Sequence, residues 1–217
     1  MKTFIVFFTS IFFSLAVQAQ MTIGPRLGVN FSKQALNSPY EVWNTGTLFG
    51  GVINIPFKND ISFQGEFLFS QKGYREEFNG NESYDDLTST YMEAPILVNY
   101  LYSTGRINFF GNGGVFAAYW KSGTYESKIG ENDILIEDYQ FTTSSDDDGF
   151  KDNRLDYGLV IGAGILYDKI GTSGNIILEF RYTKGLAPIS SLENASLDFV
   201  PGKNTSLSIS LAYMLYL

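Results

Sequence analysis

The sequence predicts an all-β fold, an eight-stranded antiparallel up-and-down β-barrel that spans a membrane. Three observations predict it. Apolar residues alternate with other residues along eight segments, which is the period of a strand with one apolar face. The connections between these segments alternate between short and long. The chain also opens with an apolar leader, which is typical of exported proteins.

The first 19 residues have the pattern of a secretory signal peptide. Lys2 precedes an apolar run over residues 4–17, and the small residue Ala19 favours cleavage after it. A transmembrane anchor is the alternative, but the run is too short to span a bilayer comfortably, and polar sequence resumes at Gln20. We therefore expect residues 1–19 to be a signal peptide and residues 20–217 to form one outer-membrane β-barrel domain.

Eight segments after the leader show the strand period, with Gly, Asn, Asp and Ser between them. No stretch there shows a sustained helical period. In chain order the predicted strands cover residues 21–31, 45–57, 61–73, 90–101, 107–124, 155–167, 175–186 and 204–217.

The apolar faces of these strands suit lipid. In the last strand Leu207 to Leu217 place one apolar face opposite serines, because successive side chains point to opposite sides. The apolar face of residues 155–167 begins and ends with a tyrosine, Tyr157 and Tyr167. Aromatic residues at both ends of an apolar face match the girdles of membrane barrels. A soluble sandwich or lipocalin-type barrel is the competing architecture, since each also uses short alternating strands.

Connection lengths orient the barrel. The short connections are 58–60, 102–106 and 168–174, and the long ones are 32–44, 74–89, 125–154 and 187–203. Short turns on one side and long loops on the other are typical of outer-membrane barrels, with both termini on the periplasmic side. We therefore expect the cell outer membrane as the location.

Charged residues on the inward faces predict an ionic network in the lumen. Its five members are Arg26, Glu66, Glu93, Glu179 and Arg181. Buried charges need partners, and here three carboxylates would face two guanidinium groups. We expect a structural plug, with a gated proton or ion path as the alternative. An eight-stranded barrel has an interior that side chains can fill, which disfavours a general porin.

Enzymatic chemistry is not expected, and no cofactor is implied. The chain has no histidine and no cysteine, which removes the common general base, the thiol nucleophile and the usual zinc ligands. The glycine cluster at 111–114 lacks the following helix that a phosphate-binding loop requires. The net charge of −8 makes nucleic acid an improbable partner.

Acidic residues crowd the connection 125–154. A calcium-binding hand would have to run from Ser144 to Leu155, and it lacks the required acids at both ends. We favour a solvated loop, and we keep as a hypothesis that weak divalent-cation binding links it to lipopolysaccharide phosphates.

Four motifs together resemble the PorT-type outer-membrane β-barrel family. They are Gly28-Val29-Asn30-Phe31-Ser32, Phe67-Leu68-Phe69-Ser70-Gln71-Lys72-Gly73, Tyr91-Met92-Glu93-Ala94-Pro95-Ile96-Leu97 and Arg181-Tyr182-Thr183-Lys184-Gly185-Leu186. Their order and spacing match along nearly the whole mature chain. The resemblance implies an outer-membrane barrel of Gram-negative bacteria, in a group where some relatives assist protein export.

The expected function is structural or interaction-based, with the long extracellular loops as the contact surface and a secretion-system accessory role as its setting. The expected partners are outer-membrane lipid, lipopolysaccharide, and secretion-system or surface proteins. A narrow gated transport protein or porin-like channel is the alternative.

Overall fold

The computed structural model describes residues 21–34, 38–78, 83–130, 133–142, 150–170, 174–192 and 202–217. The predicted signal peptide and its cleavage site after Ala19 lie outside the described residues and stay predictions. Throughout the described ranges, no helix has the length and apolar character needed to cross a membrane.

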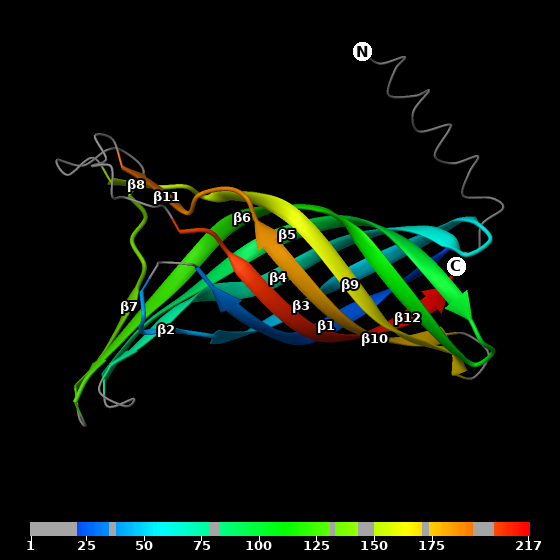
Figure 1. Cartoon of the computed structure of the whole chain (residues 1–217), viewed down its shortest axis with the longest axis horizontal. Helices are drawn as coiled ribbons and strands as arrows, with labels where there is room; N and C mark the ends of the chain where they lie inside the picture. Colours follow the sequence, from blue (N-terminus) through cyan, green and yellow to red (C-terminus); the bar gives the residue numbers. More distant parts are fainter. Residues whose placement is uncertain are drawn as a thin grey trace, which may run out of the picture.

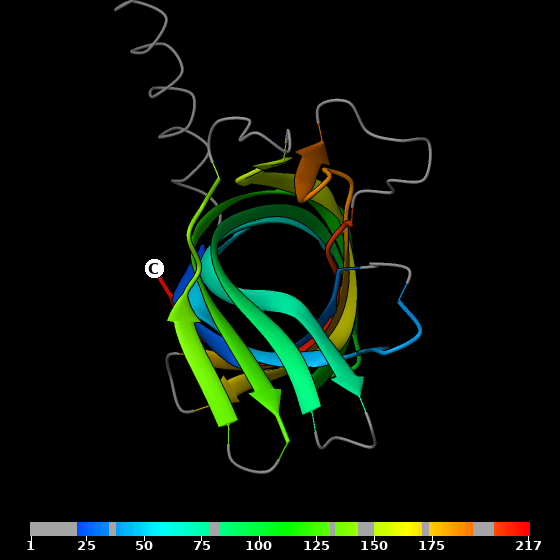
Figure 2. The same ribbon diagram turned by 90° about the vertical axis from the view of Figure 1, so that its left-hand side faces the viewer.

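Eight long antiparallel strands pair into a closed ring (Figures 1 and 2), which confirms the predicted fold class. In ring order they are β1 (Thr22–Lys33), β3 (Asn44–Lys58), β4 (Ile61–Phe78), β5 (Ser83–Ser103), β6 (Ile107–Ile129), β9 (Leu155–Ile170), β10 (Gly174–Gly185) and β12 (Thr205–Tyr216). The ring closes between β1 and β12, which pair from Thr22 with Tyr216 to Lys33 with Thr205. Closure leaves the ring without free edges, as a sheet in lipid requires.

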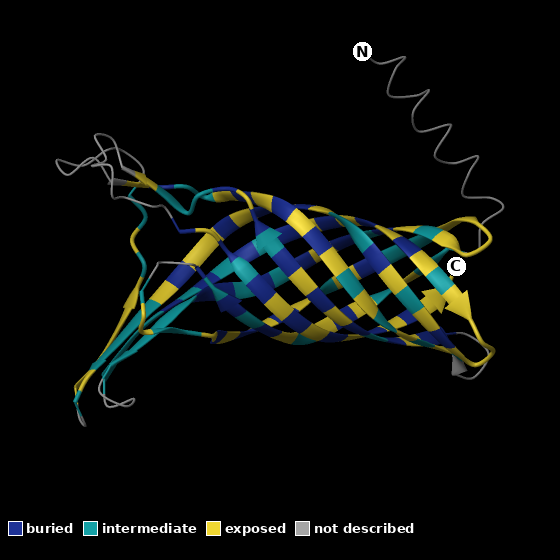
Figure 3. Ribbon diagram, in the orientation of Figure 1, coloured by how far each residue is buried: buried dark blue, intermediate teal, exposed yellow. Residues whose placement is uncertain are grey.

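The two faces of each strand differ in burial, and Figure 3 shows the resulting alternation around the barrel. On β12, Leu207, Ile209 and Leu211 are exposed, whereas the serines between them are buried. Exposed aromatic rings lie near both ends of the outward faces. They are Tyr100, Tyr102, Phe109 and Tyr167 toward the short turns, and Trp43, Tyr119, Tyr157 and Tyr182 toward the long connections. The apolar surface therefore faces outward and the polar surface faces the lumen.

Tight turns and both described chain ends share one end of the barrel (Figure 1). Asn59 adopts a φ of 44° between β3 and β4, and Gly105 a φ of 118° between β5 and β6. Such left-handed conformations suit asparagine and glycine, which explains these residues in the turns. The backbone N–H of Leu217 donates to the carbonyl of Met21 at 2.9 Å. This is the short-turn end, and the other end is the long-loop end.

Three strands run further than the sequence predicts. β4, β5 and β6 extend into the expected loops 74–89 and 125–154, and two short strands, β2 (Glu41–Val42) and β7 (Asp133–Asp138), pair with β4 and β6. The prediction of these segments as loops was wrong, because both faces of the extensions are polar or mixed and lack apolar alternation. We call β2, β7, residues 74–78, 83–89 and 122–129 the outer sheet. Nearby, β8 (Phe150–Asp152) pairs with β11 (Ser190–Leu192).

Candidate functional site in the lumen and the outer sheet

Four of the five predicted lumen residues form one buried ionic cluster. Arg26 on β1 donates from Nη1 to Glu179 Oε2 on β10 at 2.5 Å, and its Nη2 lies 3.4 Å from Glu66 Oε1 on β4. Arg181 donates to both oxygens of Glu66 at 2.8 Å and to Glu179 Oε1. Two guanidinium groups thus face two carboxylates, and we call these four residues the central network. Gln64, Asn112 and Ser210 add neutral hydrogen bonds to it.

The central network crosses the full width of the barrel. Strands β4 and β10 lie opposite one another, four steps apart in either direction around the ring. The Arg181–Glu66 pair joins them through two parallel hydrogen bonds, a geometry that gives both strength and a fixed orientation. A lumen bridged in this way by buried side chains is filled at this level.

Glu93, the fifth predicted residue, belongs to a separate pair. Its Oε2 lies 2.5 Å from the ammonium of Lys72, and both side chains are almost fully buried. The structure therefore does not bring Glu93 to the guanidinium groups, and the expected excess of carboxylates is absent from the central network. Sequence reasoning missed Lys72, although it shares the inward parity of Glu66 on the same strand. Parity alone could have found it.

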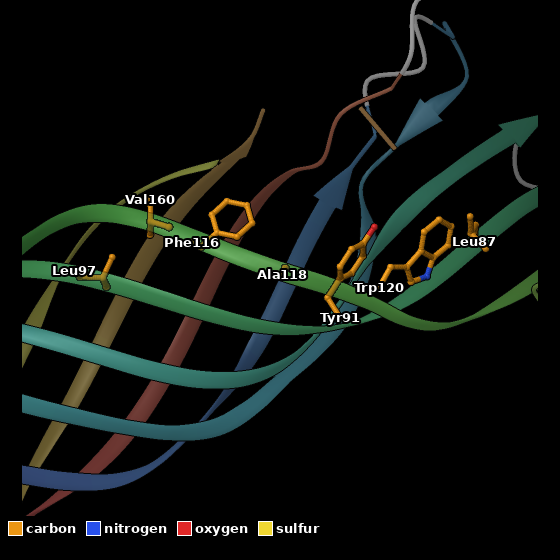
Figure 4. Packing of buried hydrophobic residues seen from close by; sticks show 7 residues of the cluster. All are labelled: Leu87, Tyr91, Leu97, Phe116, Ala118, Trp120 and Val160. Atoms are coloured by element: carbon orange, nitrogen blue, oxygen red, sulfur yellow. The ribbon is translucent and has the colours of Figure 1, made fainter. Parts of the chain in front are cut away.

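Buried aromatic residues fill the lumen toward the long-loop end. Figure 4 shows Tyr91 and Trp120 among the apolar side chains that β5, β6 and β9 contribute to this cluster. Two rings from the segment after β7 join them, with the centroids of Tyr139 and Phe141 at 5.1 and 4.9 Å from that of Trp120. We call Tyr91, Trp120, Tyr139 and Phe141 the aromatic cap. Its Tyr91 ring also contacts a charged pair, since the Lys72 ammonium lies 5.6 Å from the Tyr91 ring centroid.

Hydrogen bonds hold the segment that carries Tyr139 and Phe141. The Tyr139 hydroxyl donates to Asp152 Oδ1 at 3.0 Å, and the Thr142 N–H donates to Asp152 Oδ2 at 2.9 Å. Burial and the neighbouring Asp152 charge raise the pKa of Tyr139, so its hydroxyl stays protonated and continues to donate at neutral pH. The sequence predicts this segment to be a solvated loop, and the structure shows it packed into the lumen instead. The alternation Tyr139-Gln140-Phe141 was the available signal against that assignment.

A small cavity opens at the short-turn end of the lumen. Its volume is about 210 Å³, and amide side chains from four strands contribute to its wall, namely Asn54, Gln64, Asn99 and Asn175. Gln64 also donates to Glu66, so the inner wall of this vestibule adjoins the central network. The vestibule therefore leads toward the ion pairs.

The outer sheet is held by polar contacts suited to water. Arg75 pairs with Glu77 at 2.8 Å and lies 3.7 Å from Asp86. Its guanidinium also stacks 4.1 Å from the Tyr84 ring centroid. Burial raises the pKa of Tyr74 to about 12, which keeps its hydroxyl neutral beside the carboxylates of the sheet.

One edge of the outer sheet is apolar and open. β7 pairs with β6, and in the described part of the chain nothing pairs with its other side. Ile134, Leu135 and Ile136 are 55%, 52% and 62% exposed. An exposed apolar edge strand is a template for pairing with another strand.

The structure does not assemble a metal site from the acidic connection. Asp146, Asp147 and Asp148 lie outside the described residues, and within the described ranges no three acids, histidines or cysteines are placed to hold a metal ion. The calcium hypothesis stays a prediction.

Comparisons with known proteins give one family match. The model of the family described as outer membrane protein beta-barrel domain matches residues 18–191. No curated protein sequence matches the chain. Among solved structures, neisserial surface protein A has 10% identity and a TM-score of 0.47, covering 89% of this chain and 96% of that one. OprG from Pseudomonas aeruginosa has 13% identity and a TM-score of 0.46, covering 91% and 94%.

A third similar structure is Ail of Yersinia pestis in complex with the heparin analogue sucrose octasulfate. It has 14% identity and a TM-score of 0.41, covering 90% of this chain and 99% of that one. The family match spans most of the present chain, whereas the structural likenesses concern the architecture alone.

Proposed function

This chain belongs to the outer membrane protein beta-barrel domain family and is an integral outer-membrane barrel, and from that premise we propose that it is a plugged anchor presenting the outer sheet to a protein partner. The observation that carries the proposal is the edge of β7, which no other strand of the described residues pairs with and which exposes Ile134, Leu135 and Ile136. Proteins usually cover, shorten or charge such an edge, and this one is apolar in its centre.

The chemistry of the edge selects the partner. Asp133, Glu137 and Asp138 flank the three apolar residues, and acidic side chains outnumber basic ones over the outer sheet. An added strand would gain backbone hydrogen bonds from β7, and its side chains would meet an apolar centre between acidic ends. We therefore propose as partner an extended protein segment in which apolar residues alternate with lysine or arginine.

The resemblance to the PorT-type family supports a setting for this contact. We propose that the partner belongs to the secretion system or to the cell surface, and that the barrel is not an enzyme. The lumen supports an anchoring role, because the central network and the aromatic cap are both built from side chains that fill it.

A synthetic peptide tests the contact directly. We expect a ten-residue peptide of alternating isoleucine and lysine to bind the folded barrel in detergent micelles, as measured by fluorescence anisotropy. The same peptide with glutamate in place of lysine is the matched control and should bind at least tenfold more weakly. The double variant Ile134→Asp and Ile136→Asp should abolish binding. Equal binding of both peptides, or binding unchanged in the variant, would overturn the proposal.

A narrow gated transport role is the second candidate. The vestibule of about 210 Å³ favours it, because it brings a polar cavity up to the central network. Electrical conductance across a planar bilayer distinguishes this role from that of a plugged anchor.

A further inference from the structure

We propose that the outward face of β1, β12 and β10 binds the phosphorylated headgroup of an outer-leaflet glycolipid through Lys33, Lys184 and Lys203. This inference is independent of the edge-strand contact of β7, because it concerns different strands and a different ligand. It rests on the register of three neighbouring strands and on the surroundings of the three ammonium groups.

The strand register brings two of the lysines to the same row. Lys33 on β1 and Lys184 on β10 both pair with Thr205 on the intervening β12. Neighbouring strands lie about 5 Å apart, so the two lysine backbones are about 10 Å apart on either side of the threonine. The Lys184 ammonium donates to Thr205 Oγ1 at 3.0 Å, which brings it toward the centre of the row.

The third lysine lies beside this row. The backbone N–H of Lys203 donates to the carbonyl of Gln34 at 2.8 Å, next to Lys33, and its side chain is exposed. Three lysines and one threonine thus lie on or directly beside three adjacent strands, with the Lys184 ammonium at Thr205 and the Lys33 ammonium on the side of β1 that faces β2 and Trp43. We call Lys33, Lys184, Lys203 and Thr205 the lysine patch.

The lysine patch borders the apolar outward surface at its long-loop end. One pleat toward the short-turn end, the same three strands carry Phe31, Leu207 and Tyr182, which pair with one another in register. Tyr182 and Leu207 are 40% and 44% exposed. Lys33 lies 5.3 Å from the ring centroid of the exposed Trp43. An apolar row next to the cations and a tryptophan beside them are typical of the part of a protein that lies at a membrane interface.

The ammonium groups of Lys33 and Lys184 both donate to uncharged oxygens. Among the described residues, the ion pairs involve other basic side chains: Arg26, Lys72, Arg75 and Arg181. The acid beside the patch is Glu41, and one of its oxygens accepts the backbone N–H of Gln34. Lys33 donates to the backbone carbonyl of Glu41 at 3.0 Å, a neutral partner. Ammonium groups at a membrane surface attract anionic lipid headgroups.

Orientation decides which leaflet supplies the ligand. The patch is at the long-loop end, because Lys33 ends β1, Lys184 is next to the end of β10 and Thr205 begins β12. This end faces the cell exterior in barrels of this kind. The lipid there that carries phosphate is a glycolipid of the lipid A type. The phosphorylated headgroup of this lipid would meet Lys184, Lys203 and the Thr205 hydroxyl, with Lys33 at its edge on the β3 side, while the acyl chains of the lipid cover the apolar row of Phe31, Leu207 and Tyr182.

The test uses purified lipid A and its enzymatically dephosphorylated form, titrated into the folded full-length barrel in detergent micelles. We expect lipid A to bind and the dephosphorylated form to bind far more weakly. The triple variant Lys33→Gln, Lys184→Gln and Lys203→Gln should lower the affinity roughly 100-fold, because each lysine near an anionic surface contributes about fivefold.

Two further variants keep the result interpretable. Lys58→Gln removes the exposed lysine at the short-turn end and should leave lipid A binding unchanged. Lys184→Gln alone, which disturbs the surface least, should lower the affinity about fivefold. Equal affinity for both lipid forms, or equal losses in the Lys58 and Lys184 variants, would overturn the proposal. Excess inorganic phosphate that displaces lipid A completely would also overturn it, because the acyl chains would then contribute nothing.

Discussion

Glu179 has the most demanding position in the central network. It is 0% exposed and accepts hydrogen bonds from Arg26, Asn112 and Arg181, which come from three different strands. A carboxylate held in this way compensates two buried positive charges. Removing it leaves those charges without a full set of partners in a medium that solvates them poorly.

Glu179→Ala is therefore expected to destabilise the barrel by about 3–5 kcal/mol, the usual cost of breaking a buried ion pair. The urea midpoint of the protein folded in detergent micelles measures this. Glu76→Ala, in the water-exposed part of the outer sheet, is the control and should change stability by less than about 0.5 kcal/mol. An unchanged midpoint for the Glu179 variant would refute its role in the network.

The Lys72–Glu93 pair offers a second measurement at this scale. Lys72→Met should cost about 3 kcal/mol, because Glu93 then stays buried without its counter-charge. The double variant Lys72→Met and Glu93→Leu should recover most of that loss, since replacing both members of a buried pair is often nearly neutral. A double-mutant cycle in urea gives the coupling, and simple additivity of the two single losses would contradict the pairing.

At the scale of elements, the sequence predicts a strand where one face is apolar and the other is not. β1, β3, β9, β10 and β12 lie within a few residues of their predicted ends, because lipid demands apolar residues along their outward faces. The extensions of β4, β5 and β6 rise into water. There, side chains such as Arg75 and Asp86 bond across strands, and no period of two in hydropathy marks them.

Some neighbouring strands approach so closely that only glycine fits between them. A Cβ atom on Gly114 of β6 would lie 2.0 Å from the carbonyl oxygen of Ile96 on β5, whereas one on Gly51 of β3 would meet nothing within 4 Å. We expect Gly114→Ala to destabilise the barrel by about 1–3 kcal/mol by forcing these strands apart. Gly51→Ala should change stability by less than about 0.5 kcal/mol. The two variants can be compared by urea midpoint and by the gel mobility of unheated samples, and equal behaviour would argue against the contact.

The whole molecule combines a lumen filled by side chains with an outer sheet that extends from one side of the barrel. Parity on single strands predicted which charges point inward, and the structure brings four of them together. Parity could not predict that Glu93 pairs with Lys72 instead. The choice of partner depends on how far each strand is shifted along the barrel axis relative to its neighbours, and parity does not give that shift. The aromatic cap could not be predicted from strand parity either. Two of its members, Tyr139 and Phe141, come from a connecting segment and not from a predicted strand.

The filled lumen predicts that the barrel does not conduct ions. Arg181 and Glu66 bridge opposite strands, and the aromatic cap fills the level above, so we expect no reproducible single-channel steps in planar bilayers. A barrel of this family reconstituted at equal protein density but known to conduct serves as the positive control. Regular, voltage-dependent steps from the purified protein would favour the transport role over the plugged anchor.

The outer sheet rises from three neighbouring strands, so the molecule has a front and a back when seen along the membrane normal (Figure 2). A barrel in a fluid bilayer turns freely about that normal. Two such barrels, or a barrel and a fixed assembly, would therefore bind one another in only one rotational orientation. Any lasting association would stop the rotational diffusion of the protein as well as its lateral diffusion.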